Sequence, residues 1–226
     1  MAPILGYWDI RGLATPIRLL LVQAGVEYEE KFYTAGGPPD FDRSHWTNEK
    51  FNLGLEFPNL PYYIDGETKL TQSGVILRYL ANKYNLAGDN ETERTRADLL
   101  ATQLADYHMD YVMICYNPNF LNLKDAYAEG VPGKMNLLAK FLGSNKFAVG
   151  DKLTYADFVL FEYLENQLYF NPQVLNDFPS LDQYHKRMQS VEAVDKYFKS
   201  SKAIKYPFNN SKAAFGGRLS EQPSKK

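Results

Sequence analysis

Tyr7 stands at the end of a short apolar run, Ile4 to Tyr7, which predicts a buried strand. A phenol has a pKa of about 10, so it is neutral near pH 7 and acts as a hydrogen-bond donor rather than as a base. A donor fixed at the end of a strand can stabilise a neighbouring anion. The alternative is that Tyr7, one of 17 tyrosines, simply packs in the core.

Gln72-Ser73 ends the stretch PNLPYYIDGETKLTQS at 58–73 and opens a run of helix formers. The free N–H groups and the dipole at a helix start favour an anion. The same stretch places Pro61, which cannot donate to a sheet ladder, at the mouth of a predicted strand. On residue type alone, Pro61 is a strand breaker and Ser73 an ordinary N-cap.

Arg43, Trp46 and Lys50 recur at spacings of three and four, which is typical of a helix. The group offers two cations and an indole N–H to a carboxylate. The alternative is a solvated charged face. The three histidines lie too far apart in the pattern to suggest a metal site. Cys115 is the single cysteine, so no internal disulfide forms, and we expect it to be buried and inert.

The first 84 residues must position these groups. Strand 4–7, a helix from Leu13 that closes at Gly25, and strand 28–33 form a βαβ unit. After a Gly-Pro-rich loop at 35–39, a hairpin turning at Asp65-Gly66 leads into a helix at 73–83. This order predicts an α/β thioredoxin-like domain. Its first strand ends in Tyr7-Trp8 instead of a Cys-x-x-Cys pair, which excludes disulfide exchange.

The second part of the chain, 91–216, predicts an all-α helical domain. Expected helices cover 91–115, roughly 137–141, a segment opened by the Thr154–Asp157 capping box, 180–190 and 191–200. The small, polar residues from Gly216 to Lys226 predict a disordered tail, assigned to 217–226.

The global composition excludes several function classes. The net charge of −2 and pI of about 6.0 give no electrostatic case for nucleic acid or an anionic membrane. No apolar stretch approaches the ~20 residues that span a bilayer. MAPILGYW lacks the features of a signal peptide, so a cytoplasmic location is expected, and the glycosylation patterns at Asn90 and Asn209 are treated as chance matches.

Motifs in both halves of the chain resemble those of mu-class glutathione transferases. The matching stretches are LGYWDIRGL at 5–13, DRSHWTNEKF at 42–51, FPNLP at 57–61, TQS at 71–73, MICYNP at 113–118 and SSK at 200–202. The resemblance runs from about residue 3 to 216 and implies an enzyme that adds the thiol of glutathione to hydrophobic electrophiles. Departures at His45, Gly74 and 206–215 concern the electrophile preference.

The resemblance implies a glutathione site built from both subunits. A cis bond at Leu60-Pro61 would let the Leu60 backbone pair with the tripeptide as an added strand. Gln72-Ser73 would receive the γ-glutamyl carboxylate, and Lys50 and Trp46 the glycyl carboxylate. The full implied set is Tyr7, Trp8, Arg43, Trp46, Lys50, Asn59, Leu60, Gln72, Ser73 and, from the partner subunit, the residue that corresponds to Asp106.

The resemblance also gives Tyr7 the catalytic role of stabilising the glutathione thiolate. The electrophile pocket is expected at Trp8, Leu13, Met109, Val112 and Tyr116, each of which is equally well explained as core. A homodimer would form through Phe57, Arg78 and Asp98. Glutathione is a co-substrate, and no cofactor or metal is expected. A glutathione-dependent isomerase and a non-catalytic carrier of hydrophobic ligands are the alternatives.

Overall fold

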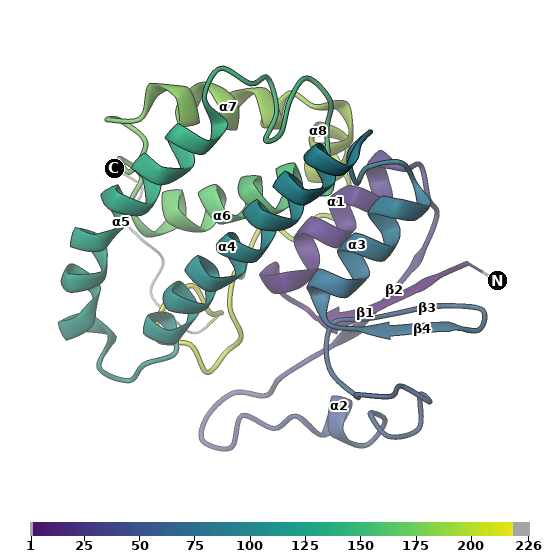
Figure 1. The fold of residues 1–226 in the computed structure, drawn as a ribbon. Helices are drawn as coiled ribbons and strands as arrows, with labels where there is room; N and C mark the ends of the chain where they lie inside the picture. The colour runs from purple at the N-terminus through teal and green to yellow at the C-terminus, as the bar shows by residue number, and fades with distance from the viewer. Residues whose placement is uncertain (1, 219–226) are drawn as a thin grey trace.

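The computed structural model describes residues 2–218 of the 226. A four-stranded sheet, ordered β2-β1-β3-β4, forms the N-terminal domain (Figure 1). Its strands are β1 Ile4–Trp8, β2 Glu29–Tyr33, β3 Tyr62–Asp65 and β4 Thr68–Thr71. β1 and β2 run parallel, whereas β3 is antiparallel to both β1 and β4. This mixed sheet confirms the predicted α/β thioredoxin-like arrangement.

The helices of the N-terminal domain lie on opposite sides of the sheet. α1 Thr15–Gln23 and α3 Ser73–Lys83 cover the face that meets the helical domain. The single turn α2 Ser44–Thr47 lies on the other side, within the long connection from β2 to β3 (Figure 1). A 3₁₀ turn, η1 Gly12–Ala14, leads from β1 into α1.

The second domain is all-helical, as predicted. Its helices are α4 Glu91–Cys115, α5 Phe120–Leu142, α6 Tyr155–Phe170, α7 Pro179–Gln189 and α8 Glu192–Lys199. α6 is the central helix, and the capping box predicted at its start is present: Thr154 and Asp157 exchange hydrogen bonds between side chain and backbone. Among residues 2–218, no helix combines the length and apolar character needed to cross a membrane.

A buried ion pair joins the two domains. Arg11, just before η1, donates from Nη2 and Nε to the Glu162 carboxylate at 2.6 and 3.0 Å, and from Nη1 to Glu165 at 3.1 Å. Both glutamates belong to α6. The Arg11 guanidinium also lies 4.5 Å from the centre of the Phe208 ring. The turn after β1 is therefore attached to the core of the helical domain.

Two of the predictions about this domain are wrong in extent. The helix expected at 137–141 is α5, which begins at Phe120 and continues through Pro132. Gly130, Pro132 and Gly133 are poor helix formers and obscured the helical pattern in the sequence, but α5 accommodates all three. The tail prediction fails at 216–218, because the Gly216 carbonyl accepts from the N–H groups of Phe208 and Asn209, and Arg218 pairs with Asp9. The rest of the predicted tail, 219–226, lies outside the described residues.

Candidate active site

The strand register brings three of the predicted positions to one edge of the sheet. β1 ends at Trp8, which is in register with Tyr33 at the end of β2. Tyr62, at the start of β3, pairs with Gly6 and with Thr71 at the end of β4. Next to these paired positions in the chain lie three predicted parts of the site: Tyr7, Leu60 and Gln72-Ser73. Since β3 runs against β1 and β4, its beginning and their ends share an edge.

The hydroxyl oxygen of Tyr7 is oriented by the turn that follows β1. The backbone N–H of Leu13 donates to Tyr7 Oη at 3.0 Å. This bond uses a lone pair of the oxygen and leaves the phenolic proton to donate elsewhere. Burial raises the pKa of Tyr7 to about 12, which outweighs the lowering effect of the Leu13 bond. Tyr7 is therefore a neutral donor across the physiological pH range.

Gly12 permits this close approach. Its φ of +41° lies in the left-handed region, and a Cβ added there would stand 2.6 Å from Tyr7 Oη. The turn is held from the C-terminal segment as well, because Arg11 N–H donates to the Pro207 carbonyl and Gly12 N–H to the Phe208 carbonyl. The support that orients Tyr7 therefore comes from residues about 200 positions away in the sequence.

The Leu60-Pro61 bond is cis, as predicted. In this structure the Leu60 N–H donates to Asn59 Oδ1 at 2.9 Å. Asn59 accepts this bond through its side-chain oxygen. The short side chain folds back onto the next residue, a local bond that asparagine makes easily. An added peptide strand would have to replace this bond.

Gln72 is strained and Ser73 is not the N-cap. Gln72 itself occupies the N-cap of α3 with a φ of +68°, and it makes no side-chain capping bond. For a non-glycine residue this conformation costs on the order of 1–3 kcal/mol, and such strain is commonly concentrated at functional sites. The N–H groups of Val75 and Ile76 bond to the Gln72 carbonyl. The N–H groups of Ser73 and Gly74, in the first turn of α3, have no hydrogen-bond partner among residues 2–218 and can receive an anion.

The group of Arg43, Trp46 and Lys50 is only partly helical. α2 spans 44–47, so Arg43 precedes it, and Lys50 follows it with an N–H bond to the Trp46 carbonyl at 2.9 Å. Arg43 is exposed, whereas Trp46 is only 6% exposed. Within residues 2–218, neither the indole N–H of Trp46 nor the Lys50 ammonium has a hydrogen-bonding or ionic partner; Lys50 lies 4.9 Å from the Phe51 ring centre.

The aspartates of α4 differ in their partners. Asp98 accepts from Tyr155 Oη, and Asp110 pairs with Lys134 at 2.5 Å. Asp106 is exposed and has no ion pair or hydrogen bond from its side chain to another described residue. Arg78 also interacts with Tyr155. The two residues predicted to pair across a dimer interface thus meet the same tyrosine within one chain.

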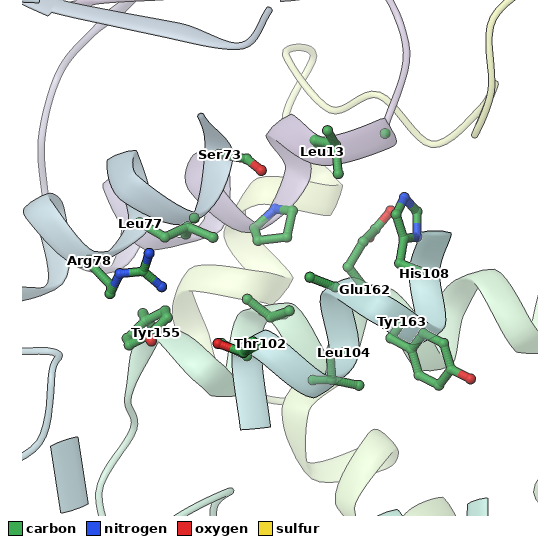
Figure 2. Close-up of a pocket in the computed structure, with 16 residues that line it drawn as sticks. Leu13, Ser73, Leu77, Arg78, Thr102, Leu104, His108, Tyr155, Glu162 and Tyr163 are labelled. Carbon is green, nitrogen blue, oxygen red and sulfur yellow. The ribbon is translucent and has the colours of Figure 1, made fainter. Parts of the chain in front are cut away.

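The residues predicted to form the electrophile pocket do not all line one cavity. Trp8, Val112 and Tyr116 are half-buried and Met109 is 58% exposed. Tyr116 Oη accepts from the Asn210 N–H at 2.7 Å, and its charge, if it ionised, would raise the pKa of Tyr7, so the two phenols are neighbours. Leu13 alone of the five lines a cavity of about 270 Å³ between α3, α4, α6 and η1, which Ser73 also lines (Figure 2).

The remaining candidate nucleophile and metal ligands do not form a site. Burial raises the pKa of the Cys115 thiol to about 12, so it stays protonated. Across residues 2–218, no cluster of histidine, cysteine or acidic side chains has the geometry to hold a metal ion.

Sequence reasoning missed three supporting residues. Arg11 and Glu162 position the turn that bonds to Tyr7, and Glu49 joins α2 to β2 through Tyr33 Oη at 2.8 Å. The position of Arg11, a charged residue in the turn directly after a predicted strand, was a signal of a supporting role. Glu162 and Glu49 carried no local signal, because their partners are distant in the sequence.

Comparison with known proteins agrees with this geometry. A family model described as the glutathione S-transferase N-terminal domain matches residues 3–82, and one described as the glutathione S-transferase C-terminal domain matches residues 105–201. The chain belongs to the glutathione S-transferase family. Its activity class is that of a transferase that conjugates glutathione.

Several curated proteins that are similar to this chain are of the mu class. The chain is 48% identical to human glutathione S-transferase Mu 1 and 49% identical to rat glutathione S-transferase Mu 7, in both cases over 96% of this chain and all of the relative. Among solved structures, a pi-class glutathione S-transferase from Onchocerca volvulus superposes with a TM-score of 0.83 at 33% identity, covering 94% of this chain and all of that one. The resemblance to the mu class is thereby confirmed.

Proposed function

We propose that Tyr7 performs the activating step of glutathione conjugation in this protein. A free thiol has a pKa of about 8.5, so only a few per cent is thiolate at neutral pH. The Tyr7 hydroxyl, oriented by the Leu13 N–H at 3.0 Å, would donate to the sulfur and stabilise its charged form. A charge-assisted hydrogen bond of about 1.5–3 kcal/mol suffices to make thiolate a major species. The Leu13–Tyr7 bond is the observation that carries this assignment.

The reaction then needs no further catalytic base at the sulfur. The thiol proton leaves to solvent, and the thiolate attacks the electrophilic carbon. A carbon–sulfur bond forms while the leaving group departs with its electron pair, or while the electrons of an activated double bond move onto its acceptor. The neutral Tyr7 retains its proton, consistent with the pKa of about 12 that burial imposes on it.

Glutathione would lie along the edge of the sheet, across Leu60. Its γ-glutamyl carboxylate fits the free N–H groups at the start of α3, beside the strained Gln72. Its glycyl carboxylate fits Lys50 and the indole N–H of Trp46, which lack other partners within the described chain. Its cysteinyl backbone would take over the Leu60 N–H from Asn59. Trp8 and Arg43 would border the tripeptide.

We propose a homodimer in which the partner's copy of Asp106 binds the amino group of glutathione. Of the three aspartates considered on α4, Asp98 and Asp110 already have partners within the chain. Phe57 is 73% exposed on the loop before Leu60, which suits insertion into a second subunit. Arg78 and Asp98 would border this interface beside Tyr155. A cytoplasmic location remains a prediction.

The electrophile is expected beside Tyr7 and Tyr116, against Trp8, Leu13, Met109 and Val112. Trp8, Val112 and Tyr116 are half-buried, and Met109 is a flexible, exposed wall residue.

The test of the whole assignment is retention on immobilised glutathione followed by conjugation of an aryl halide, monitored by product absorbance. Lys50→Ala and Trp46→Ala should raise the glutathione KM more than they change kcat, since they remove contacts present in ground and transition states alike. Normal constants in both variants would refute the proposed glycyl subsite.

A further inference from the structure

Glu49 stands between Trp46 and Lys50, and both of its carboxylate oxygens are occupied. Oε2 accepts from Tyr33 Oη at 2.8 Å, and Oε1 accepts from the Lys31 ammonium. Lys31 and Tyr33 both belong to β2. The carboxylate therefore ties the segment after α2 directly to the sheet.

The bond to Tyr33 extends into a directed chain of hydroxyl groups. Tyr33 Oη lies 3.0 Å from Tyr62 Oη. The hydrogen bond from Lys31 lowers the pKa of Glu49, so at neutral pH the carboxylate has no proton to give. Tyr33 must then donate to Glu49 and accept from Tyr62. This order links β3, β2 and the α2 segment through one set of bonds.

The same two tyrosines pack against Trp46. The Tyr33 ring meets the indole edge-on at 5.1 Å between centroids, and the Tyr62 ring stacks on it at 6.2 Å with an angle of 22° between planes. Positions of the indole and of the Glu49 carboxylate are thus coupled through Tyr33. The N–H groups of Glu49 and Lys50 both bond to the Trp46 carbonyl, so the three residues form one turn.

α2 is held in place by tertiary contacts: besides the Glu49 bonds, the Thr34 N–H donates to His45 Nδ1 at 3.2 Å, and Trp46 is buried against Tyr33 and Tyr62. It is a four-residue helix with no side-chain cap, and it lies on the side of the sheet away from the helical domain (Figure 1). A helix of this length is not stable by itself. Its position must come from tertiary contacts, of which the Glu49 bonds are the ionic part.

We propose that Glu49 is a positioning residue for glutathione binding: it fixes α2 against β2 so that Trp46 and Lys50 meet the glycyl carboxylate together. This inference rests on the proposed glycyl subsite. Glu49 would not touch glutathione, since both of its oxygens face β2. It would reduce the ordering that Trp46 and Lys50 undergo on binding.

The sign of the effect separates this role from simple electrostatics. Glutathione carries net negative charge, and Glu49 lies next to the cation proposed to bind it. If Glu49 acted only through its charge, Glu49→Gln would strengthen glutathione binding. If Glu49 positions α2, the same substitution breaks the pairing with Lys31 and weakens binding.

The experiment compares Glu49→Gln with Glu56→Gln by calorimetric titration of the dimer with glutathione. Glu56 is an exposed glutamate in the same connection and has no hydrogen bond or ion pair to another described residue. We expect Glu49→Gln to raise the Kd about fivefold to tenfold, the size of one ordinary hydrogen bond, with kcat at saturating glutathione within about twofold of wild type. Glu56→Gln should change neither. Unchanged or tighter binding by Glu49→Gln would overturn the proposal.

A fluorescence measurement distinguishes positioning from direct contact. Trp8 and Trp46 are the two tryptophans in the chain, so a Trp8→Phe background reports on Trp46 alone. In that background Glu49→Gln should increase quenching of Trp46 by acrylamide without glutathione present. Weaker binding with unchanged quenching would mean that Glu49 contacts the ligand, which contradicts the proposal. If instead Lys50→Ala and Trp46→Ala leave affinity unchanged, the glycyl subsite itself is wrong.

Discussion

The hydroxyl oxygen of Tyr7 accepts a hydrogen bond of 3.0 Å from the backbone N–H of Leu13, six residues further along the chain. A tyrosine at the end of a strand is thereby oriented by the turn that starts the next helix. The Arg11–Glu162 ion pair attaches the same turn to α6. The direction in which Tyr7 donates therefore depends on both domains.

Gly12→Ala tests the space around the Tyr7 hydroxyl. The new Cβ would stand 2.6 Å from Tyr7 Oη at a backbone φ of +41°, so Tyr7 must shift. We expect kcat/KM to fall by about tenfold or more in steady-state assays. The matched control is Gly25→Ala, where φ is +68° but no atom lies within 4 Å of the added Cβ. It should lose about 1 kcal/mol of stability and keep its activity. Equal activity losses in both variants would contradict the steric account.

Phe57→Ser tests the dimer and the contribution of Asp106. Phe57 is 73% exposed in the single chain, and burial of such an anchor in a partner is worth about 2–4 kcal/mol at each of two symmetric contacts. We expect sedimentation to show dissociation at micromolar protein. Glutathione affinity should weaken with it and recover as the protein concentration rises. A variant that stays dimeric with wild-type affinity would show that Phe57 is not the anchor.

His108 predicts a loss of stability in mild acid. Burial lowers the pKa of His108 from its ordinary 6.5 to about 4. Between these pH values His108 is protonated in the unfolded chain but neutral in the folded chain. The free energy of unfolding therefore falls as the pH drops from 6.5 toward 4. We expect His108→Gln to remove about 2 kcal/mol of the difference in unfolding free energy between pH 7 and pH 5, measured in urea. Parallel pH profiles for variant and wild type would show that another group is responsible.

Most of the fold could be predicted from the sequence, because its local signals agreed with the tertiary structure. Alternation, the Asp65-Gly66 turn and the Thr154–Asp157 box place the strands and α6 close to where they lie. α5 was underestimated because Gly130, Pro132 and Gly133 lower its helical signal, while packing of Val131 and Met135 sustains the helix. Tertiary contacts override local propensity there.

The site could be predicted in its residue types but not in its hydrogen bonds. Tyr7, Ser73 and Leu60 do meet at one edge, as strand order alone required. The bond from Leu60 N–H to Asn59 could not be foreseen, because it depends on a side-chain rotamer. The Arg11–Glu162 pair spans 151 residues, and no local pattern signals such a contact.

The most direct test follows the thiol of bound glutathione by its thiolate absorbance as a function of pH, in the wild-type protein and in Tyr7→Phe. The wild type should titrate well below the ordinary thiol pKa of about 8.5, because the Tyr7 hydroxyl donates to the sulfur. In Tyr7→Phe the titration should return toward that value, and kcat near neutral pH should fall by about tenfold to a hundredfold, with glutathione Kd little changed. An identical titration in both proteins would contradict the central claim that Tyr7 stabilises the thiolate.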